Sequence, residues 1–261
     1  MSEKKLAWII GTGPSLNDID VKKLKDHKTM TFNRAYIAFE DWGFDPTYYL
    51  SIDSNDLRAM YKDLNKVISN SKVEAFFLTD CKDNDRHAPE HFQDQDKVGA
   101  KEMFVDKENV YTIYNSRRTG LGKIKIDHEN NSIKAKHHNN SGFMGLMVLY
   151  ALGYNEIAFV GCDARYRDDE ESNKDIIKHG KRGGEYESTA DTDINHFRND
   201  YFGKGMRFGK PNESSIISIW RRGKSVIDAI EDLEVYSCTP NSNLNGIYKY
   251  IDFEDFLNGK R

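Results

Sequence analysis

The stretch LAWIIGTGPSL, residues 6–16, decides the fold that this sequence predicts. Residues 6–10 form an apolar run that ends in turn residues, which is typical of a strand buried on both faces of a parallel sheet. Gly11 and Gly13 then allow backbone angles and close approaches that a side chain would block. Pro14 opposes an extended continuation. The stretch therefore predicts a buried strand that leads through a tight turn into a helix.

The residues after the turn suggest what it binds. Ser15 or Asn17 is expected to cap the following helix, whose first N–H groups would point back toward the turn and form an anion site. A tight connection without any ligand is the alternative. The turn lacks the third glycine of the dinucleotide-binding fingerprint and carries Pro14, which disfavours a nicotinamide or flavin site. The sequence also contains no G-x-x-x-x-G-K-[ST] run, which excludes a P-loop.

The composition excludes several classes of protein. The chain has 261 residues, of which 38% are hydrophobic and 31% charged, as in a soluble globular protein. A net charge of -4 provides no broad basic field, so we expect no nucleic-acid partner. Three widely spaced cysteines favour a reducing cytoplasm over a disulfide framework or a zinc site. No apolar run reaches the length of about 18 residues that a transmembrane segment needs. Peripheral membrane contact and a homo-oligomer stay open.

Apolar strand patterns alternate with helical patterns along the chain. Strands are expected at residues 28–32, 48–52, 73–78, 156–160 and 235–237, with an edge strand at 110–114, a hairpin of 123–126 with 132–136, and helices at 19–27, 57–68, 143–152 and 216–233. This alternation predicts an α/β fold, with a Rossmann-like, mostly parallel sheet and helices on both faces. Residues 1–261 would form a single Rossmann-like domain. Within it, residues 164–211 have little apolar periodicity and would form a lid-like or acceptor-binding insertion.

Small or polar residues stand where the predicted strands end. They are Gly11, Thr12, Gly13, Asn33, Asp53, Asp80, Asp163, Thr239, Pro240 and Asn241. The carboxyl ends of parallel strands meet at one edge of a sheet, where ligands bind in such folds. One such residue is ordinary turn chemistry, but several at one edge favour a polar small-molecule pocket.

Several motifs resemble those of the bacterial sialyltransferase-like glycosyltransferases. They are GTGPSL (11–16), FNRAY (32–36) followed by FED (39–41), SGFMGLMVLYALGYNEIAFVGCD (141–163), NHF (195–197) and CTPNS (238–242). The same signatures resemble the related motility-associated flagellin glycosyltransferases and the 6-hydroxymethylpterin pyrophosphokinase-like family. The resemblance covers both ends and the centre of the chain, and its motifs are specific only in combination.

The resemblance implies an activity and a set of roles. It implies transfer of an acidic, nonulosonic sugar from a CMP-sugar donor to a glycan or protein acceptor hydroxyl, with inversion and without a required cofactor. His196 would be the general base, Tyr166 and Tyr186 would stabilise the leaving phosphate, and Asn33 would contact the phosphate or the sugar. The other expected substrate-binding residues are Gly11, Thr12, Gly13, Pro14, Ser15, Asp53, Asn140, Ser141, Gly142, Asp163, Thr239, Pro240, Asn241 and Ser242. Histidine suits the role of base because it titrates near neutral pH, although any one histidine is more often a packed or surface residue.

Two departures from the sialyltransferase pattern keep other functions open. Thr12 and Asp53 stand where those enzymes carry asparagines. A carboxylate beside a phosphate repels it unless a cation intervenes. One alternative is therefore a Mg/ATP-dependent pyrophosphokinase of the 6-hydroxymethylpterin type, with Asp53 as a magnesium ligand. Another is a non-catalytic nucleotide-sugar binding protein. Trp220 is expected in the core rather than beneath a sugar.

Overall fold

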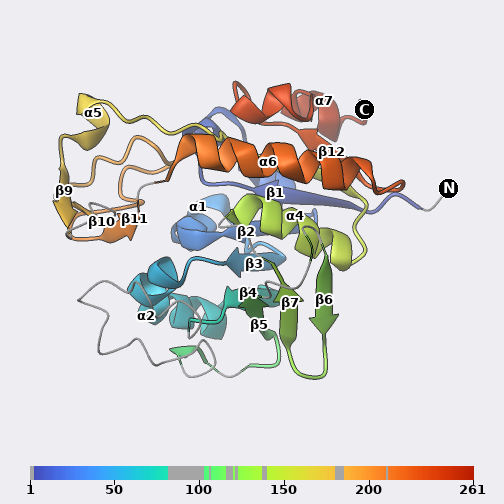
Figure 1. The fold of residues 1–261 in the computed structure, drawn as a ribbon, viewed down its shortest axis with the longest axis horizontal. Coiled ribbons are helices and arrows are strands. Elements are labelled where there is room, and N and C mark those ends of the chain that lie inside the picture. Colours follow the sequence, from blue (N-terminus) through green and yellow to red (C-terminus); the bar gives the residue numbers. More distant parts are fainter. Residues whose placement is uncertain are drawn as a thin grey trace.

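A ten-stranded sheet forms the centre of the molecule (Figure 1). A computed structural model of the chain describes residues 3–81, 103–105, 107–115, 120, 123–136, 140–179, 185–209 and 211–261. The strands, in spatial order, are β13 (Lys249–Tyr250), β12 (Glu234–Ser237), β8 (Glu156–Val160), β1 (Leu6–Ile10), β2 (Thr29–Phe32), β3 (Tyr48–Ser51), β4 (Ala75–Thr79), β5 (Val110–Asn115), β7 (Ser132–Ala135) and β6 (Ile124–Asp127). All neighbours in this order are parallel except β6 with β7, which confirms the expected mostly parallel sheet.

The strand order contains a topological switch point beside β1. From β1 the chain adds strands on one side as far as β5, and it later returns to place β8 on the other side. Leu6 pairs with Glu156 and Ile10 with Val160, so β1 and β8 end at the same level. The order β3-β2-β1-β8-β12 is that of a Rossmann-like fold, in which ligands bind beyond the strand ends at the switch point.

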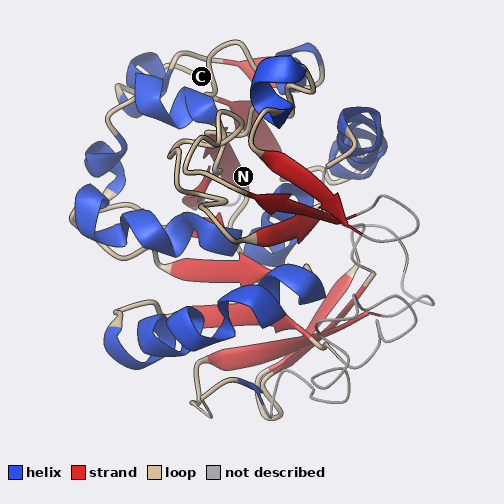
Figure 2. Cartoon of the chain, turned by 90° about the vertical axis from the view of Figure 1, so that its left-hand side faces the viewer, coloured by secondary structure: helices blue, strands red, loops and turns tan. Residues whose placement is uncertain are grey.

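Helices cover both faces of the sheet, as the alternating pattern predicted (Figure 2). The helices are α1 (Phe39–Trp42), α2 (Ser54–Asn70), α4 (Ser141–Ala151), α5 (Glu170–Asn173), α6 (Glu213–Asp228) and α7 (Phe253–Leu257). Side chains of a strand alternate between its two faces. Trp8 and Ile10 therefore enter the hydrophobic core beneath α2 and α7, and Ala7 and Ile9 enter the core beneath α4 and α6. Within the described part of the chain, no helix combines the length and the apolar character needed to cross a bilayer.

The expected helix at residues 19–27 is wrong. In this range the chain forms a short 3-10 helix, Val21–Leu24, which follows another 3-10 helix, Pro14–Asp18. Ile19 follows the first helix with extended backbone angles, and Asp20 caps the second, since its side chain accepts a hydrogen bond from the N–H of Lys22 at 3.2 Å. Val21 and Leu24 are buried all the same, so the apolar pattern found the inward-facing residues but not the type of helix.

The expected caps of the first helix are also wrong. Gly13 occupies the cap position of the first 3-10 helix, without a side-chain hydrogen bond. Ser15 and Asn17 lie inside this helix, where their side chains make distant contacts instead. The Ser15 hydroxyl donates to Asp163, and the Asn17 amide donates to the carbonyl of Phe197 at 2.9 Å.

The strand expected at residues 110–114 exists, but it does not lie at an edge. β5 pairs in parallel with β4 on one side and with β7 on the other. The predicted hairpin of β6 and β7 is confirmed, and its attachment through β7 covers the edge that β5 would have exposed. The sequence showed the hairpin but not the strand that it joins.

The insertion of residues 164–211 has a small sheet of its own, which the sequence did not predict. It contains α5 and the antiparallel strands β9 (Ile176–His179), β10 (Glu185–Ser188) and β11 (Arg207–Gly209), in the order β11-β10-β9. Residues 180–184 and 210 of the insertion lie outside the described residues. Aromatic side chains of the insertion, including Tyr201, Phe202 and Phe208, join the core on the α2 side of the sheet.

Candidate active site

Two glycines meet at the switch point. Gly11 follows β1 and Gly161 follows β8, and a Cβ on Gly11 would lie 2.3 Å from the carbonyl oxygen of Gly161. The N–H of Gly13 donates to that same carbonyl at 2.8 Å. Only a residue without a side chain fits at position 11, which agrees with the close approach expected from the sequence. The glycine turn is thus fixed against the end of β8.

Asp163 lies directly on the glycine turn. Its Oδ2 accepts a hydrogen bond from the Ser15 hydroxyl at 2.7 Å, and its Oδ1 lies 3.4 Å from the N–H of Ser15. Burial raises the pKa of the Asp163 carboxyl, and the hydrogen bonds from Ser15 oppose that rise. The N–H groups of Gly13 and Ser15, which were expected to face a phosphate, therefore both donate to acceptors of the protein itself.

A cavity of about 450 Å³ opens beside this turn, at the carboxyl ends of the strands. The expected site residues that line it are Thr12, Gly13, Asn33, Asp53, Asn140, Ser141, Gly142, Asp163, Tyr166 and His196. The expected site residues that do not line it are Gly11, Pro14, Ser15, Thr239, Pro240, Asn241 and Ser242. The end of β2, the start of α4, the end of β8 and the insertion therefore converge on one cavity.

The CTPNS motif does not line the cavity but hydrogen-bonds to residues that do. The Thr239 hydroxyl accepts the N–H of Cys162 at 3.2 Å, and the Ser242 hydroxyl donates to the carbonyl of Cys162 at 2.7 Å. The exposed Asn241, expected to contact the donor, offers its carbonyl to Arg165 at 3.2 Å. These contacts fix residues 162–165, and Cys162, Asp163 and Arg165 themselves line the cavity.

Asn33 has an uncommon backbone conformation at the end of β2. Its φ of 54° lies in the left-handed region, which asparagine tolerates better than most residues. The hydroxyls of Ser51 and Ser141 each lie 3.4 Å from its Oδ1, and Tyr49 donates to its carbonyl. Among the described residues nothing accepts from its side-chain amide nitrogen. Two amide hydrogens at the cavity wall are therefore left for a ligand.

Two carboxylates stand where β3 leads into α2. Oδ1 of Asp53 lies 3.3 Å from the N–H of Asp56, in the first turn of the helix. Burial raises the pKa of Asp56 well above its ordinary value, the charge of Asp53 raises it further, and Arg34 opposes both. In the part of the chain that the structure describes, no three carboxylate, histidine or cysteine side chains form a group that could hold a metal ion.

His196 comes from the insertion and is held on several sides. Its Nδ1 lies 2.8 Å from Oδ2 of Asp193, and the side chains of His196 and Asp193 are 13% and 8% exposed. The ring stacks on Tyr201 at 3.9 Å between centroids and 6° between planes, and Phe202 meets it edge-on at 5.0 Å. Asp193 was not among the predicted site residues, although an acid three positions before a histidine is visible in the sequence.

The two expected tyrosines differ in position. Tyr166 lines the cavity, and burial raises its pKa, as does the nearby charge of Asp193. Its backbone N–H donates to Glu213 of α6 at 2.9 Å. Tyr186 instead lies buried in the small sheet, where it stacks on Phe208, and it does not line the cavity. Of these two tyrosines, Tyr166 is the one placed to contact a ligand in the cavity.

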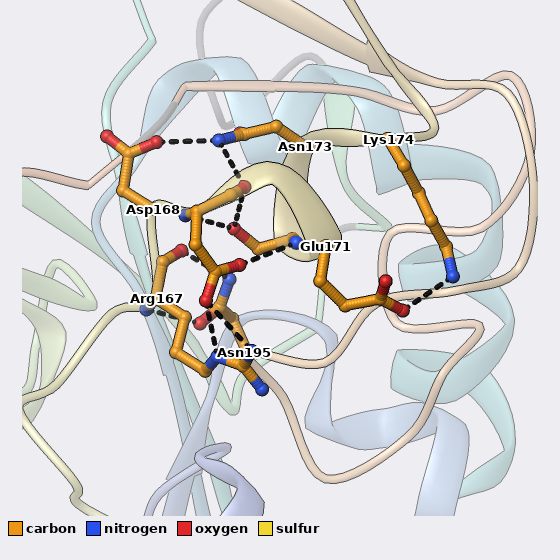
Figure 3. A network of polar contacts seen from close by, with 8 residues as sticks. Arg167, Asp168, Glu171, Asn173, Lys174 and Asn195 are labelled. Atoms are coloured by element: carbon orange, nitrogen blue, oxygen red, sulfur yellow. Dashed lines mark hydrogen bonds and ion pairs between the residues drawn. The ribbon is translucent and has the colours of Figure 1, made fainter.

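A polar network ties the start of the insertion to the residue before His196 (Figure 3). The Asn195 side chain accepts the N–H of Arg167 at 2.7 Å and donates to its carbonyl at 3.1 Å. Arg167 also pairs with Asp169 at 2.8 Å, and Asp169 caps α5 through the N–H of Ser172. The residue next to His196 is thereby fixed to the segment that carries Tyr166.

Comparison with known proteins supports the fold. No protein-family model matches this chain, and no curated protein sequence matches it. Among solved structures, the MAf glycosyltransferase from Magnetospirillum magneticum AMB-1 aligns with a TM-score of 0.51 and 13% identity. The alignment covers 100% of this chain and 35% of that one, so this chain spans about a third of its length. The sialyltransferase CstII from Campylobacter jejuni, solved with the substrate analogue cytidine-5'-monophosphate, aligns with a TM-score of 0.45, 19% identity and coverage of 95% and 85%. At 13% identity, the likeness to the MAf protein shows a shared α/β fold.

Proposed function

We propose that this protein is a glycosyltransferase that moves an acidic, sialic-acid-like sugar from a CMP-sugar donor to an acceptor hydroxyl with inversion. One observation carries the proposal, namely the cavity that is lined by His196 of the insertion, by Asn33 just after β2 and by Ser141 at the start of α4. The MAf protein of similar fold, a glycosyltransferase, and the sequence motifs support it. The kind of sugar comes from the motif resemblance alone.

In the proposed reaction, His196 receives one proton and CMP is the leaving group. His196 takes the proton of the acceptor hydroxyl while the hydroxyl oxygen bonds to the anomeric carbon of the sugar. The bond from that carbon to the donor phosphate breaks on the opposite side, so CMP leaves with the electron pair and the configuration inverts. Tyr166, like any tyrosine, carries its proton at neutral pH, and burial raises its pKa further, so its hydroxyl would donate a hydrogen bond to the departing phosphate.

Asn33, rather than the glycine turn, would hold the donor phosphate or the sugar carboxylate. Its side-chain amide has no acceptor among the described residues, whereas the N–H groups of Gly13 and Ser15 already donate to Gly161 and Asp163. A phosphate on the turn would also meet the carboxylate of Asp163. This assignment keeps the anionic donor away from that charge.

The pyrophosphokinase remains a second candidate because Asp53 and Asp56 both line the cavity. Carboxylate oxygens are ligands that Mg²⁺ prefers, and nucleotide phosphates usually complete its coordination. In that case ATP with magnesium, rather than a cytidine nucleotide, would occupy the cavity.

Ligand-induced thermal stabilisation separates these functions. The protein is heated with CMP, CDP, UDP, GDP or ATP, each with and without magnesium, because a ligand of the native state raises the melting temperature by mass action. Preference for cytidine nucleotides without magnesium supports the transferase. Stabilisation by ATP only when magnesium is present supports the kinase and contradicts our proposal.

Two histidine substitutions test whether the protein turns over the donor. With CMP-N-acetylneuraminate as donor and CMP release as readout, His196→Gln should lower kcat by about 10²–10⁴-fold, as loss of a general base does. His128→Gln is the control, because His128 is exposed and contacts Tyr111 away from the cavity. CMP release at the background rate by the parent protein and both variants would leave only the non-catalytic binding function, whereas parental activity in His196→Gln would refute His196 as the base.

A further inference from the structure

The carboxylate of Asp193 is the hydrogen-bonding centre of the loop that carries His196. Its Oδ1 accepts the N–H of Asn195 at 2.8 Å, and its Oδ2 lies 3.3 Å from the N–H of Phe202. The same Oδ2 lies 2.8 Å from Nδ1 of His196. The backbone N–H of Asp193 donates in turn to the carbonyl of Asn199 at 2.9 Å. These backbone hydrogen bonds fix Asp193 independently of its contact with the imidazole.

The contact dictates which imidazole nitrogen carries the proton. An ionised carboxylate only accepts hydrogen bonds, and the two backbone groups at Asp193 only donate. The Nδ1 atom of a neutral His196 must then be the donor, which leaves Nε2 as the nitrogen with a free lone pair.

The surrounding side chains keep the ring in this orientation. Tyr201 stacks on one face of the imidazole and Phe202 meets it edge-on. The loop is also tied to the glycine turn, since the N–H of Phe197 donates to the carbonyl of Thr12 at 3.0 Å. Asn17 binds the carbonyl of Phe197 at 2.9 Å. The loop that carries the imidazole is therefore tied to the glycine turn and to the 3-10 helix after it.

We propose that Asp193 is a positioning residue that holds the proton of neutral His196 on Nδ1, so that Nε2 is ready to accept a proton in the cavity. The use of Nε2 in sugar transfer rests on the proposed function, whereas the position of the proton does not. The position of the proton and its use in catalysis can therefore be measured separately.

Nuclear magnetic resonance of ¹⁵N-labelled histidine tests the structural claim in the intact protein. Long-range ¹H–¹⁵N spectra at about pH 9, where an ordinary histidine is neutral, distinguish the two tautomers. His196→Gln identifies the signal. We expect the Nδ1–H form in the parent protein and a loss of that preference in Asp193→Ala. An Nε2–H form in the parent protein, or an unchanged spectrum in Asp193→Ala, overturns the proposal.

Asp191→Ala is the matched control. Asp191 also accepts a backbone N–H across this loop, from Lys204 at 2.8 Å, but it does not contact His196. We expect this variant to keep the Nδ1–H form. The same shift in both variants would mean that general loosening of the loop moves the proton, which overturns the specific role of Asp193.

Kinetics test the catalytic claim. With CMP-N-acetylneuraminate, Asp193→Ala should lower kcat on the order of tenfold or more with little change in KM for the donor, because the base is misaligned while the donor contacts remain. Unchanged kcat together with an altered tautomer overturns the positioning role. Full activity of His196→Gln refutes the proposed function instead, and the tautomer measurement still decides the structural claim.

Discussion

Replacing Gly13 with alanine tests whether Asp163 holds the glycine turn. The added Cβ would lie 1.8 Å from Oδ2 of Asp163, so that side chain has to move. The movement breaks the 2.7 Å hydrogen bond from the Ser15 hydroxyl, and a hydrogen bond to a charged group contributes about 1.5–3 kcal/mol. The backbone at Gly13, with φ of -74° and ψ of 162°, suits alanine. Because alanine restricts the unfolded chain more than glycine does, the substitution also stabilises the folded state by about 0.4–1 kcal/mol. We expect a net loss of about 1–2 kcal/mol in the free energy of unfolding.

A double-mutant cycle makes the reasoning refutable. Asp163→Ala breaks the same hydrogen bond and should also cost about 1–2 kcal/mol. The double variant should then lose little more than Asp163→Ala alone, which is a coupling energy of about 1–2 kcal/mol in urea unfolding. Gly246→Ala is the control, because its Cβ would meet nothing within 4 Å. Additive losses from the two single changes would show that Gly13 and Asp163 act independently.

Two further changes probe packing away from the cavity. Tyr36→Phe should stabilise the protein by about 1 kcal/mol in urea unfolding, because the Tyr36 hydroxyl is buried without a hydrogen-bond partner among the described residues. Burial also raises the pKa of Tyr36 from 10.0 to about 12, so the folded state keeps this proton longer than the unfolded state and stability falls as the pH rises through that window. The variant should lose less stability there. Lower stability of Tyr36→Phe near neutral pH would contradict the first statement, and an unchanged loss of stability at high pH would contradict the second. Gly223→Ala places a Cβ 2.1 Å from Cε2 of Phe143, between α4 and α6, and should cost about 1–3 kcal/mol. The exposed neighbour Ser225→Ala should change stability by less than about 0.5 kcal/mol, and equal stability of these two variants would refute the tight packing.

The sequence predicted the parallel sheet because its buried strands are short apolar runs that end in glycine or polar residues. The run before Gly11 and the run before Gly161 became the neighbours β1 and β8, as the switch-point rule requires. The nearly uniform apolar helix α4 proved to be buried, with Asn140 as its cap at 2.8 Å, and Trp220 proved to lie in the core. Local sequence patterns are enough to predict an element whose position is decided mainly by burial of its apolar residues.

The predictions that proved wrong concern regions where contacts between residues distant in the sequence decide the structure. Nothing near Val110 indicates that β7 will cover its strand, and nothing near Ser15 indicates that its hydroxyl will bind Asp163. The strands β9 to β11 are short and mostly polar, so they carry little periodicity. His196 and Asn33 line the expected cavity, but Asn241 does not, because sequence order alone does not reveal which side of a strand end faces the opening.

The position of β1 has a consequence for how the chain acquires its structure. β1 needs β2 on one side and β8 on the other, and β8 begins at Glu156. All residues up to Asn155 have therefore been synthesised while one side of β1 still presents an unpaired row of N–H and C=O groups. Such long-range parallel pairing is slow, and an open strand edge favours association between chains. Truncated chains that end before β8 should accordingly aggregate, and folding should be completed only after β8 has left the ribosome.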